Sequence, residues 1–176
     1  MTRNLRPLSP VVIRRVRTED WRTIRALRLE MLLDSPLAFI TTHPEAAAMP
    51  DEVWIERCTS RPDGTTATYA AFDGDVAVGM AVGVDRTRPG RRVVAVVSVY
   101  VSPSHRRHGV AGCLMSEVES WAVLRGAHST SLWVVDGNDG ARGFYERIGY
   151  RMTLDRQRIT APPVRWETRM EKPLRG

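Results

Sequence analysis

Hydrophobic and polar positions in the first third of the chain predict one strand followed by two helices. Residues 11–16 read VVIRRV, which is typical of a strand. Beyond Thr18, a suitable N-cap, apolar residues recur at the spacing of an amphipathic helix, namely at Trp21, Ile24, Leu27, Met31 and Leu32. Ser35-Pro36 ends this helix, because the residue before a proline disfavours helical geometry. Residues 36–50 look irregular, and a short helical pattern returns over residues 51–58.

The middle of the chain predicts three strands in an antiparallel meander. The β-prone runs 67–72 and 76–84 are separated by Asp73-Gly74-Asp75, and Asp-Gly between two such runs is a strong hairpin signal. A second connection, which contains Pro-Gly, leads into residues 93–101, and these are almost entirely apolar. Residues 93–101 are therefore expected to form a buried strand.

The following segment predicts a helix, a strand and a second helix. Helical periodicity covers residues 110–124 and 139–148, and Gly149 ends the second of these helices. Residues 131–135 lie between them and read as a strand. This order indicates a mixed α/β fold, in which an antiparallel half is followed by a β-α-β crossover.

The last residues predict two closing strands, 150–154 and 164–170, around a loop over residues 155–163. No internal repeat, low-complexity tract or shift in composition divides the chain. We therefore expect a single domain over residues 11–176, preceded by a flexible arm over residues 1–10 that contains two prolines.

Composition narrows the range of partners. The 176 residues carry a formal net charge of +6 with a pI near 10.1, but the basic residues are spread along the chain, which favours an anionic small molecule over a nucleic acid. The longest apolar run is far shorter than the ~20 residues that cross a bilayer, and no secretory signal is expected, because no apolar stretch follows the basic residues of the N-terminus. Cys58 and Cys113 are too few for a disulfide scaffold or a zinc site. We expect a cytoplasmic protein that uses no metal and no membrane.

The junction after residues 93–101 carries the strongest chemical signal. It reads SPSHRRHGVAG, residues 102–112, and leads from a strand into a helix. A helix N-terminus exposes backbone N–H groups without intrahelical partners, and small residues there let a phosphate approach closely. The residues concerned are Arg106, Arg107, Gly109, Ala111 and Gly112, with His105 or His108 as further sources of positive charge. The stretch predicts a diphosphate cradle; the alternative is an ordinary turn with solvated arginines.

Two motifs, in order along the chain, carry a family resemblance. Residues 106–111, RRHGVA, match the pattern Q/R-x-x-G-x-G/A, and residues 138–150 match every fixed position of N-x-x-A-x-x-F/L-Y-x-x-x-G-F/Y. The matched positions of the second motif are Asn138, Ala141, Phe144, Tyr145, Gly149 and Tyr150. With these motifs the chain resembles the GNAT superfamily of N-acetyltransferases. The resemblance implies a mixed, mostly antiparallel sheet of about seven strands flanked by about four helices.

The resemblance also implies a cosubstrate, acetyl-CoA. In such enzymes the strand before the loop pairs through its backbone with the pantetheine arm, the loop amides hold the pyrophosphate, and the next strand diverges to open a slot for the thioester. The implied cofactor-binding residues are Val99, Tyr100, Val101, Arg106, Arg107, His108, Gly109, Val110, Ala111, Gly112, Asn138 and Tyr145. Asn138 has a second interpretation as a helix N-cap, and both roles can coexist.

Tyr145 is the predicted catalytic residue. It lies four residues after Ala141 on the same helix face, so a cofactor approaching the alanine would meet the phenol. A phenol with an ordinary pKa of about 10 can donate a proton to a departing thiolate, whereas the alternative is a core tyrosine with a satisfied hydroxyl. No general base is assigned, because residues 93–101 contain no acid. Their polar side chains, Ser98 and Tyr100, share one face and either position a water or the acceptor, or simply pack.

The acceptor is the open part of this interpretation. The resemblance implies a pocket lined by residues 35–50 and 155–163, whose mixed charge is compatible with a polyamine, an aminoglycoside-like drug, an amino acid or a peptide N-terminus. We expect an N-acetyltransferase in which a primary amine attacks the thioester directly, with backbone N–H groups near residues 99–101 holding the oxyanion. The alternatives are a catalytically silent acyl-CoA sensor and an enzyme acting on an RNA-bound amine. A homodimer is compatible with the resemblance.

Overall fold

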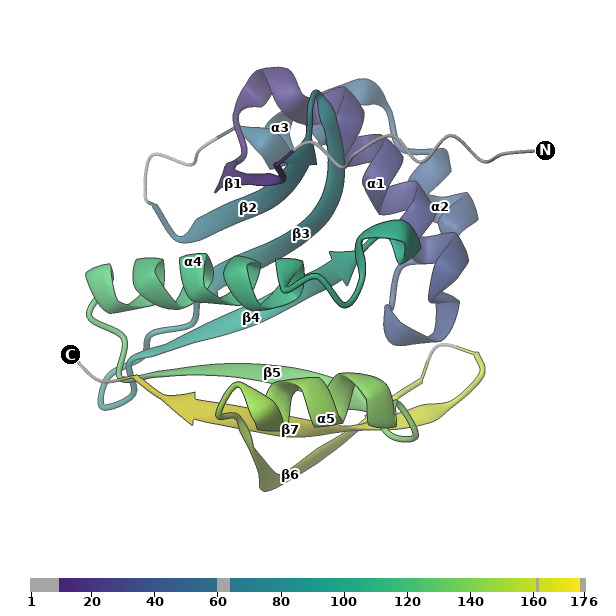
Figure 1. The fold of residues 1–176 in the computed structure, drawn as a ribbon. Helices are drawn as coiled ribbons and strands as arrows, with labels where there is room; N and C mark the ends of the chain where they lie inside the picture. Colours follow the sequence, from purple (N-terminus) through teal and green to yellow (C-terminus); the bar gives the residue numbers. More distant parts are fainter. Residues whose placement is uncertain (1–9, 60–63, 161, 175–176) are drawn as a thin grey trace.

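Seven strands form one sheet in the computed structural model, which describes residues 10–59, 64–160 and 162–174 (Figure 1). The strand order is β1-β2-β3-β4-β5-β7-β6, and every neighbouring pair is antiparallel except β4 and β5. The bounds are β1 Val12–Arg15, β2 Thr66–Asp73, β3 Val76–Asp85, β4 Val93–Val101, β5 Ser129–Val135, β6 Arg151–Ile159 and β7 Arg165–Pro173. The mostly antiparallel sheet is thus confirmed. The arm expected over residues 1–10 lies, apart from Pro10, outside the described residues.

Helices cover both faces of the sheet. In the described residues the α-helices are α1 Trp21–Asp34, α2 His43–Ala47, α3 Asp51–Cys58, α4 Val110–Leu124 and α5 Asp139–Arg147, with short 3-10 helices η1 Thr18–Asp20, η2 Pro36–Ala38 and η3 Pro103–His105. In Figure 1, α4 crosses the half of the sheet that contains β3 and β4, and α5 lies along β5 and β7. Ala71 packs in a cluster with α4, whereas Ala70 packs in a cluster with α1. Successive strand residues point to opposite faces, so α1 and α4 sandwich this half of the sheet.

Two segments differ from the sequence-based expectation. Residues 36–50, expected to be irregular, contain α2, because Thr42 and Glu45 form a capping box in which each accepts a backbone N–H of the other (2.8 and 3.4 Å). The loop expected over 155–163 is largely strand, since β6 continues to Ile159 by pairing with β7. Nearly all β6 side chains are exposed, so this strand lacks the apolar alternation that would predict it.

Two irregularities in β4 create room beside the strand. β4 pairs with β5 only as far as Ala95, and beyond it the two strands diverge, which confirms the divergence implied by the resemblance. The register between β3 and β4 shifts between Met80 and Val82, so Ser98 and Val99 together oppose a single residue in a β-bulge. Ser98 has φ +56°, a left-handed conformation that is uncommon for a residue other than glycine. The free edge and the bulge occupy the same half of β4.

Gly83 on β3 allows α4 to approach the sheet closely. Replacing it with alanine is expected to lower the free energy of unfolding by about 2 kcal/mol, because the added methyl group overpacks the core. A Cβ at this position would lie 2.8 Å from the buried indole ring of Trp121. Gly140→Ala is the matched control, because its Cβ would meet nothing within 4 Å. Urea denaturation compares the two; a Gly83→Ala protein as stable as the wild type would contradict this close approach.

Candidate functional site

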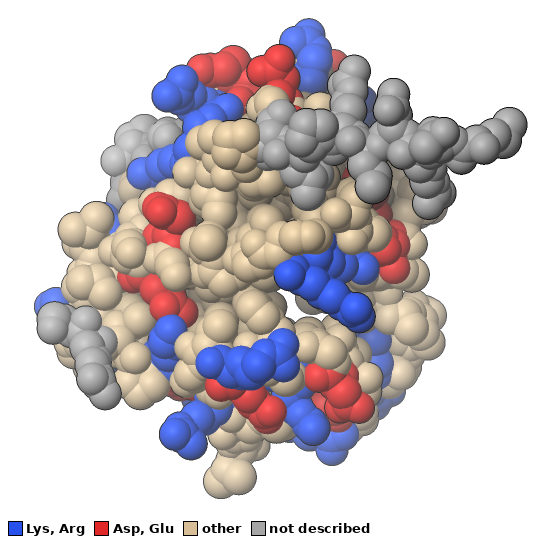
Figure 2. Space-filling view, viewed as in Figure 1, with Lys and Arg blue, Asp and Glu red and all other residues tan. Residues whose placement is uncertain are grey.

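A cavity of about 610 Å³ lies where the end of β4, η3, the first turn of α4 and one face of α5 meet. Figure 2, viewed as in Figure 1, shows an opening between α4 and α5 with basic side chains on both sides of it. All of the predicted cofactor-binding residues line this cavity except His108, which is exposed and lies outside the lining. The lining residues outside the predicted set are Ser35, His105, Gly140, Ala141, Phe144 and Arg147.

The first turn of α4 presents uncapped backbone amides to the cavity. Gly109 is the N-cap with φ +80°, and Arg107 also has a left-handed φ of +65°. No described residue accepts a hydrogen bond from the amides of Val110, Ala111 or Gly112. A Cβ added at Gly109 or Gly112 would meet nothing within 4 Å, so the space over these amides is open. Unpaired N–H groups and the helix dipole make this turn suitable for an anion.

The arginines around this turn have different environments. Arg106 donates from Nε to the carbonyl of Val101 (2.9 Å) and forms an ion pair with Asp34 at the end of α1. The Arg106 guanidinium thereby holds the pKa of the Asp34 carboxyl below its ordinary value. Arg107 and Arg147 line the cavity and form no ion pair with any described carboxylate. Arg106 therefore connects the loop to α1, whereas Arg107 and Arg147 can face a ligand.

His105 supports the loop from behind. It is buried, with Nδ1 2.9 Å from the hydroxyl of Ser104 and Nε2 3.2 Å from a carboxylate oxygen of Asp73. Asp73 is the last residue of β2, so this contact connects η3 to the β2–β3 hairpin. Both ring nitrogens are occupied by protein groups. His105 therefore connects the loop to the β2–β3 hairpin, and it also lines the cavity.

Asn138 and Tyr145 lie at the two ends of α5. The side-chain oxygen of Asn138 accepts the N–H of Ala141 (3.2 Å), which confirms the N-cap interpretation. Tyr145 is only 8% exposed, and its ring packs 5.2 Å from that of Phe144 and 5.8 Å from that of Tyr150. Its hydroxyl has no hydrogen-bond partner among the described residues. Burial raises the pKa of Tyr145 above its ordinary value, so the phenol keeps its proton at neutral pH.

A second cavity, of about 370 Å³, reaches the same tyrosine from another direction. It lies between the segment after α1, the diverging parts of β4 and β5, and the β6–β7 pair. The residues that line both cavities are Val99, Asn138, Ala141 and Tyr145. The two cavities therefore adjoin at these four residues, and such an arrangement suits a reaction between two substrates.

Glu167 is a residue of this second cavity that the sequence did not single out. It is buried on β7, and one of its carboxylate oxygens accepts a hydrogen bond from the side-chain amide of Gln157 (2.5 Å). Among the described residues that line the cavity, Glu167 is the only carboxylate. The available signal was weak, because Glu167 is one of five charged residues in the nine-residue strand β7 and nothing in the sequence distinguishes it from the other four.

The two polar side chains of β4, Ser98 and Tyr100, both reach α1. The Ser98 hydroxyl accepts a hydrogen bond from Arg28 (3.1 Å), and the Tyr100 hydroxyl donates to Glu30 (3.0 Å). Burial, and then the hydrogen bond to Glu30, raise the pKa of Tyr100 above its ordinary value. Tyr100 therefore packs with its hydroxyl satisfied, whereas Ser98 borders the second cavity.

The part of the chain that the structure describes contains neither a candidate membrane-spanning helix nor a candidate metal site. No helix there is long and apolar enough to cross a bilayer. No group of three or more His, Cys, Asp and Glu side chains there could hold a metal ion.

Comparisons with known proteins agree on one family. Rv2775 of Mycobacterium tuberculosis, named a probable N-acetyltransferase, is 28% identical over 121 residues, which cover 64% of this chain and 63% of Rv2775. The structure of yncA from Salmonella typhimurium with acetyl-CoA has a TM-score of 0.78 at 17% identity, over 96% of both chains. A GNAT superfamily phosphinothricin acetyltransferase from Sinorhizobium meliloti, in complex with acetyl-CoA, has a TM-score of 0.74 at 19% identity, over 94% of this chain and 89% of that one.

At these identities the solved structures show that the fold is shared. The chain spans 16%, 63% and 26% of the length of three curated relatives that it matches, less than two thirds in each case. The model of the acetyltransferase (GNAT) family matches residues 26–150, a range that contains the loop before α4 and all of α5. This match covers most of the sequence, and the chain therefore belongs to the acetyltransferase (GNAT) family.

Proposed function

We propose that this protein transfers an acetyl group from acetyl-CoA to a primary amine by direct attack of the amine on the thioester. The observation that carries the proposal is the open first turn of α4, whose unpaired amides face a cavity that meets a second cavity at Tyr145. The cavity at the first turn of α4 suits the acyl donor, and the second cavity, which contains Glu167, suits the acceptor. The relatives solved with acetyl-CoA support the choice of donor.

The donor would lie along β4 and across the start of α4. The diphosphate would accept hydrogen bonds from the amides between Arg107 and Gly112, with the guanidinium groups of Arg107 and Arg147 beside it. The pantetheine arm would pair with the backbone of Val99–Val101, where β5 no longer occupies the edge of β4. Asn138 would border this arm while its oxygen caps α5. These contacts direct the thioester toward the junction of the two cavities.

In the proposed reaction the amine nitrogen attacks the carbonyl carbon of the thioester. The oxyanion that forms would be held by backbone N–H groups near Val99, where the β-bulge frees β4 from regular pairing. The carbon–sulfur bond then breaks, and the Tyr145 hydroxyl donates a proton to the leaving thiolate. Tyr145 recovers a proton from the former amine nitrogen. The products are the N-acetylated amine and free coenzyme A, with one further proton released because the amine entered as an ammonium.

Glu167 is proposed to hold the acceptor ammonium and to accept its first proton. Glu167→Gln is expected to lower kcat/KM for an amine about ten-fold, the equivalent of one charge-assisted hydrogen bond. The deficit should shrink as the pH rises toward the pKa of the amine, since a neutral amine needs no proton acceptor. Steady-state thiol release between pH 6 and 10 measures this. A deficit that is the same at every pH would assign Glu167 a structural task instead.

The test of the proposed function is thiol release from acetyl-CoA in the presence of a panel of primary amines. We expect at least one amine to raise the rate well above the rate of acetyl-CoA hydrolysis, with acetyl-CoA binding measured separately by calorimetry. Binding without turnover of any amine would support the sensor alternative. Steeply salt-dependent RNA binding would support an RNA-bound acceptor, and no RNA binding at low salt would remove that alternative.

A further inference from the structure

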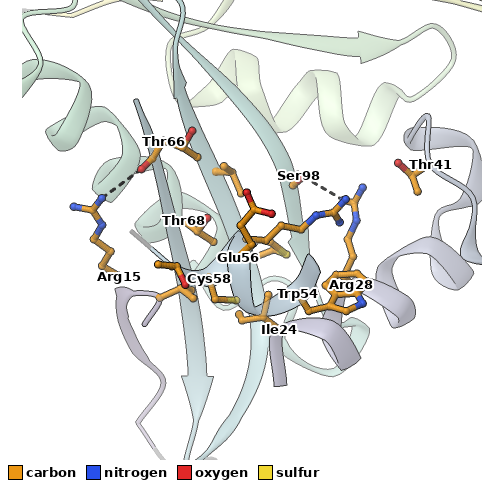
Figure 3. Close-up of a pocket in the computed structure, with 15 residues that line it drawn as sticks. Arg15, Ile24, Arg28, Thr41, Trp54, Glu56, Cys58, Thr66, Thr68 and Ser98 are labelled. Carbon is orange, nitrogen blue, oxygen red and sulfur yellow. Dashed lines mark hydrogen bonds between the residues drawn. The ribbon is translucent and has the colours of Figure 1, made fainter. Parts of the chain in front are cut away.

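A third cavity, of about 300 Å³, lies between α1, α3 and the strands β1 to β4 (Figure 3). Three residues, Arg28, Thr41 and Ser98, line both this cavity and the second cavity, which reaches Tyr145. None of the three lines the cavity assigned to the acyl donor. An acceptor with its amine near Tyr145 can therefore extend past Arg28 into the third cavity.

The Arg28 side chain lacks a counter-ion at this boundary. Its Nη1 donates to the Ser98 hydroxyl (3.1 Å), as Figure 3 shows, and also contacts the sulfur of Met31 (3.3 Å). Its guanidinium carbon lies 5.1 Å from the ring centre of Phe39. Within the described residues no carboxylate forms an ion pair with Arg28, and its Nε and Nη2 have no hydrogen-bond partner. A half-buried charge without a partner is costly, so an anion from a ligand would stabilise this guanidinium.

The surroundings of Arg28 increase the positive charge. Burial, and then the charge of Arg57, lower the pKa of Arg28 to about 10, which still leaves it charged at neutral pH. Arg57 extends over the ring of Trp54 and pairs with no described carboxylate. The third cavity has one more arginine, Arg15, and a single carboxylate, the exposed Glu56, in its described lining. An anionic ligand group would relieve the repulsion between these cations.

We propose that the amine acceptor carries an oxyanion, either a carboxylate or a phosphoryl group, which Arg28 and Arg57 bind while the amine lies between Glu167 and Tyr145. This inference rests on the proposed acetyl transfer and specifies its substrate class. The two ends of the acceptor would meet opposite charges. Glu167 is the only carboxylate and Arg28 the only arginine in the described lining of the second cavity. Polyamines and other acceptors with cations alone are disfavoured by the same arginines.

The experiment compares amines that differ only in the oxyanion. The carboxylate arm pairs β-alanine with β-alaninamide and 4-aminobutanoate with 4-aminobutanamide; the phosphoryl arm pairs O-phosphoethanolamine with ethanolamine. In the wild type we expect kcat/KM to be at least ten-fold higher for the anionic member of one arm, and that arm identifies the oxyanion. Arg28→Gln should lower kcat/KM for that member roughly 10- to 100-fold and leave the neutral member within about two-fold, because only a charged partner loses a charge-assisted hydrogen bond.

Two further variants separate recognition of the anion from an effect on the fold. Arg28→Lys should retain part of the preference for the anion, since it keeps the charge and loses the planar fork. Arg22→Gln, an exposed arginine of the same helix outside all three cavities, should leave both members of each pair unchanged. If Arg28→Gln slows anionic and neutral amines equally, Arg28 serves only to support Ser98, and the proposal is wrong.

The outcome also distinguishes this proposal from the proposed function. If neutral amines are acetylated as well as their anionic partners, acetyl transfer stands and the anion site is refuted. If acetyl-CoA does not bind, the proposed function fails. In that case the anion site is still tested by thermal melting with propanoate or ethylphosphonate: a rise in Tm for the wild type that Arg28→Gln abolishes supports it, and no rise for either protein overturns it.

Discussion

Tyr145→Phe should lower kcat about 1000-fold, within the range that a positioned general acid contributes, while the Kd for acetyl-CoA changes by less than about two-fold. The substitution removes one hydroxyl and keeps the ring that packs against Phe144 and Tyr150. Tyr145 lines both the proposed donor cavity and the proposed acceptor cavity, and its hydroxyl has no hydrogen-bond partner among the described residues. The lost interaction therefore belongs to the transition state and not to cofactor binding.

The raised pKa of Tyr145 also predicts how the wild-type kcat depends on pH. Burial raises the pKa of Tyr145 above its ordinary value, so the phenol remains a proton donor as the pH rises from 7 to 9. The wild-type rate should therefore not fall over this range through loss of the tyrosine proton. Thiol release measures kcat, and calorimetry measures the Kd of acetyl-CoA.

Tyr69→Phe is the matched control for Tyr145→Phe. Tyr69 is a partly buried tyrosine of β2 whose pKa is also raised by burial, and it lines none of the three cavities. It should keep the wild-type kcat. A Tyr145→Phe enzyme with unchanged kcat would remove the proposed acid role, and an equal loss in both variants would point to packing.

Gly112→Leu should raise the Kd for acetyl-CoA at least about 100-fold, a loss comparable to one or two charge-assisted hydrogen bonds. A Cβ at Gly112 meets no protein atom within 4 Å, so the new side chain would occupy the space over the amides that the diphosphate needs. The folded state should not suffer, because leucine favours a helix more than glycine does, by roughly 0.8 kcal/mol. We therefore expect weaker binding with an unchanged or higher Tm.

The neighbouring residue provides the control for Gly112→Leu. Cys113 is exposed, follows Gly112 on α4 and does not line the cavity, so Cys113→Leu should bind acetyl-CoA normally. Gly109 is a poorer choice, because its φ of +80° would strain any other residue and confuse binding with folding. Normal acetyl-CoA affinity in Gly112→Leu would contradict the proposed diphosphate site.

Patterns within a single element predicted most of the fold. The period of residues 110–124 and 139–148 predicted α4 and α5, and Asp-Gly predicted the β2–β3 hairpin, because each signal depends on residues a few positions apart. The two misses have the opposite cause. α2 is five residues long and depends on the Thr42–Glu45 capping box, and the second half of β6 is held by its pairing with β7. Neither needs an apolar pattern of its own.

Local sequence patterns also could not predict which groups surround an individual side chain. Arg106 and His105 line the cavity at the start of α4, as the sequence predicted, but the sequence did not predict that Arg106 also pairs with Asp34 and His105 with Asp73. Those partners are 72 and 32 residues away, so spacing along the chain contains no information about them. Whether a charged side chain faces a ligand or another part of the protein is decided by packing.

The sequence by itself determined the proposed donor half of the site. The amides of the first turn of α4 and the phenol of Tyr145 are placed by local backbone geometry, through a glycine N-cap and a four-residue helical spacing. Only the tertiary structure decided the proposed acceptor half. It joins Arg28 of α1, Ser98 of β4 and Glu167 of β7, and the first two alone are 70 residues apart. Such a pocket forms only because β4 and β5 diverge and leave space between elements that are far apart in the sequence.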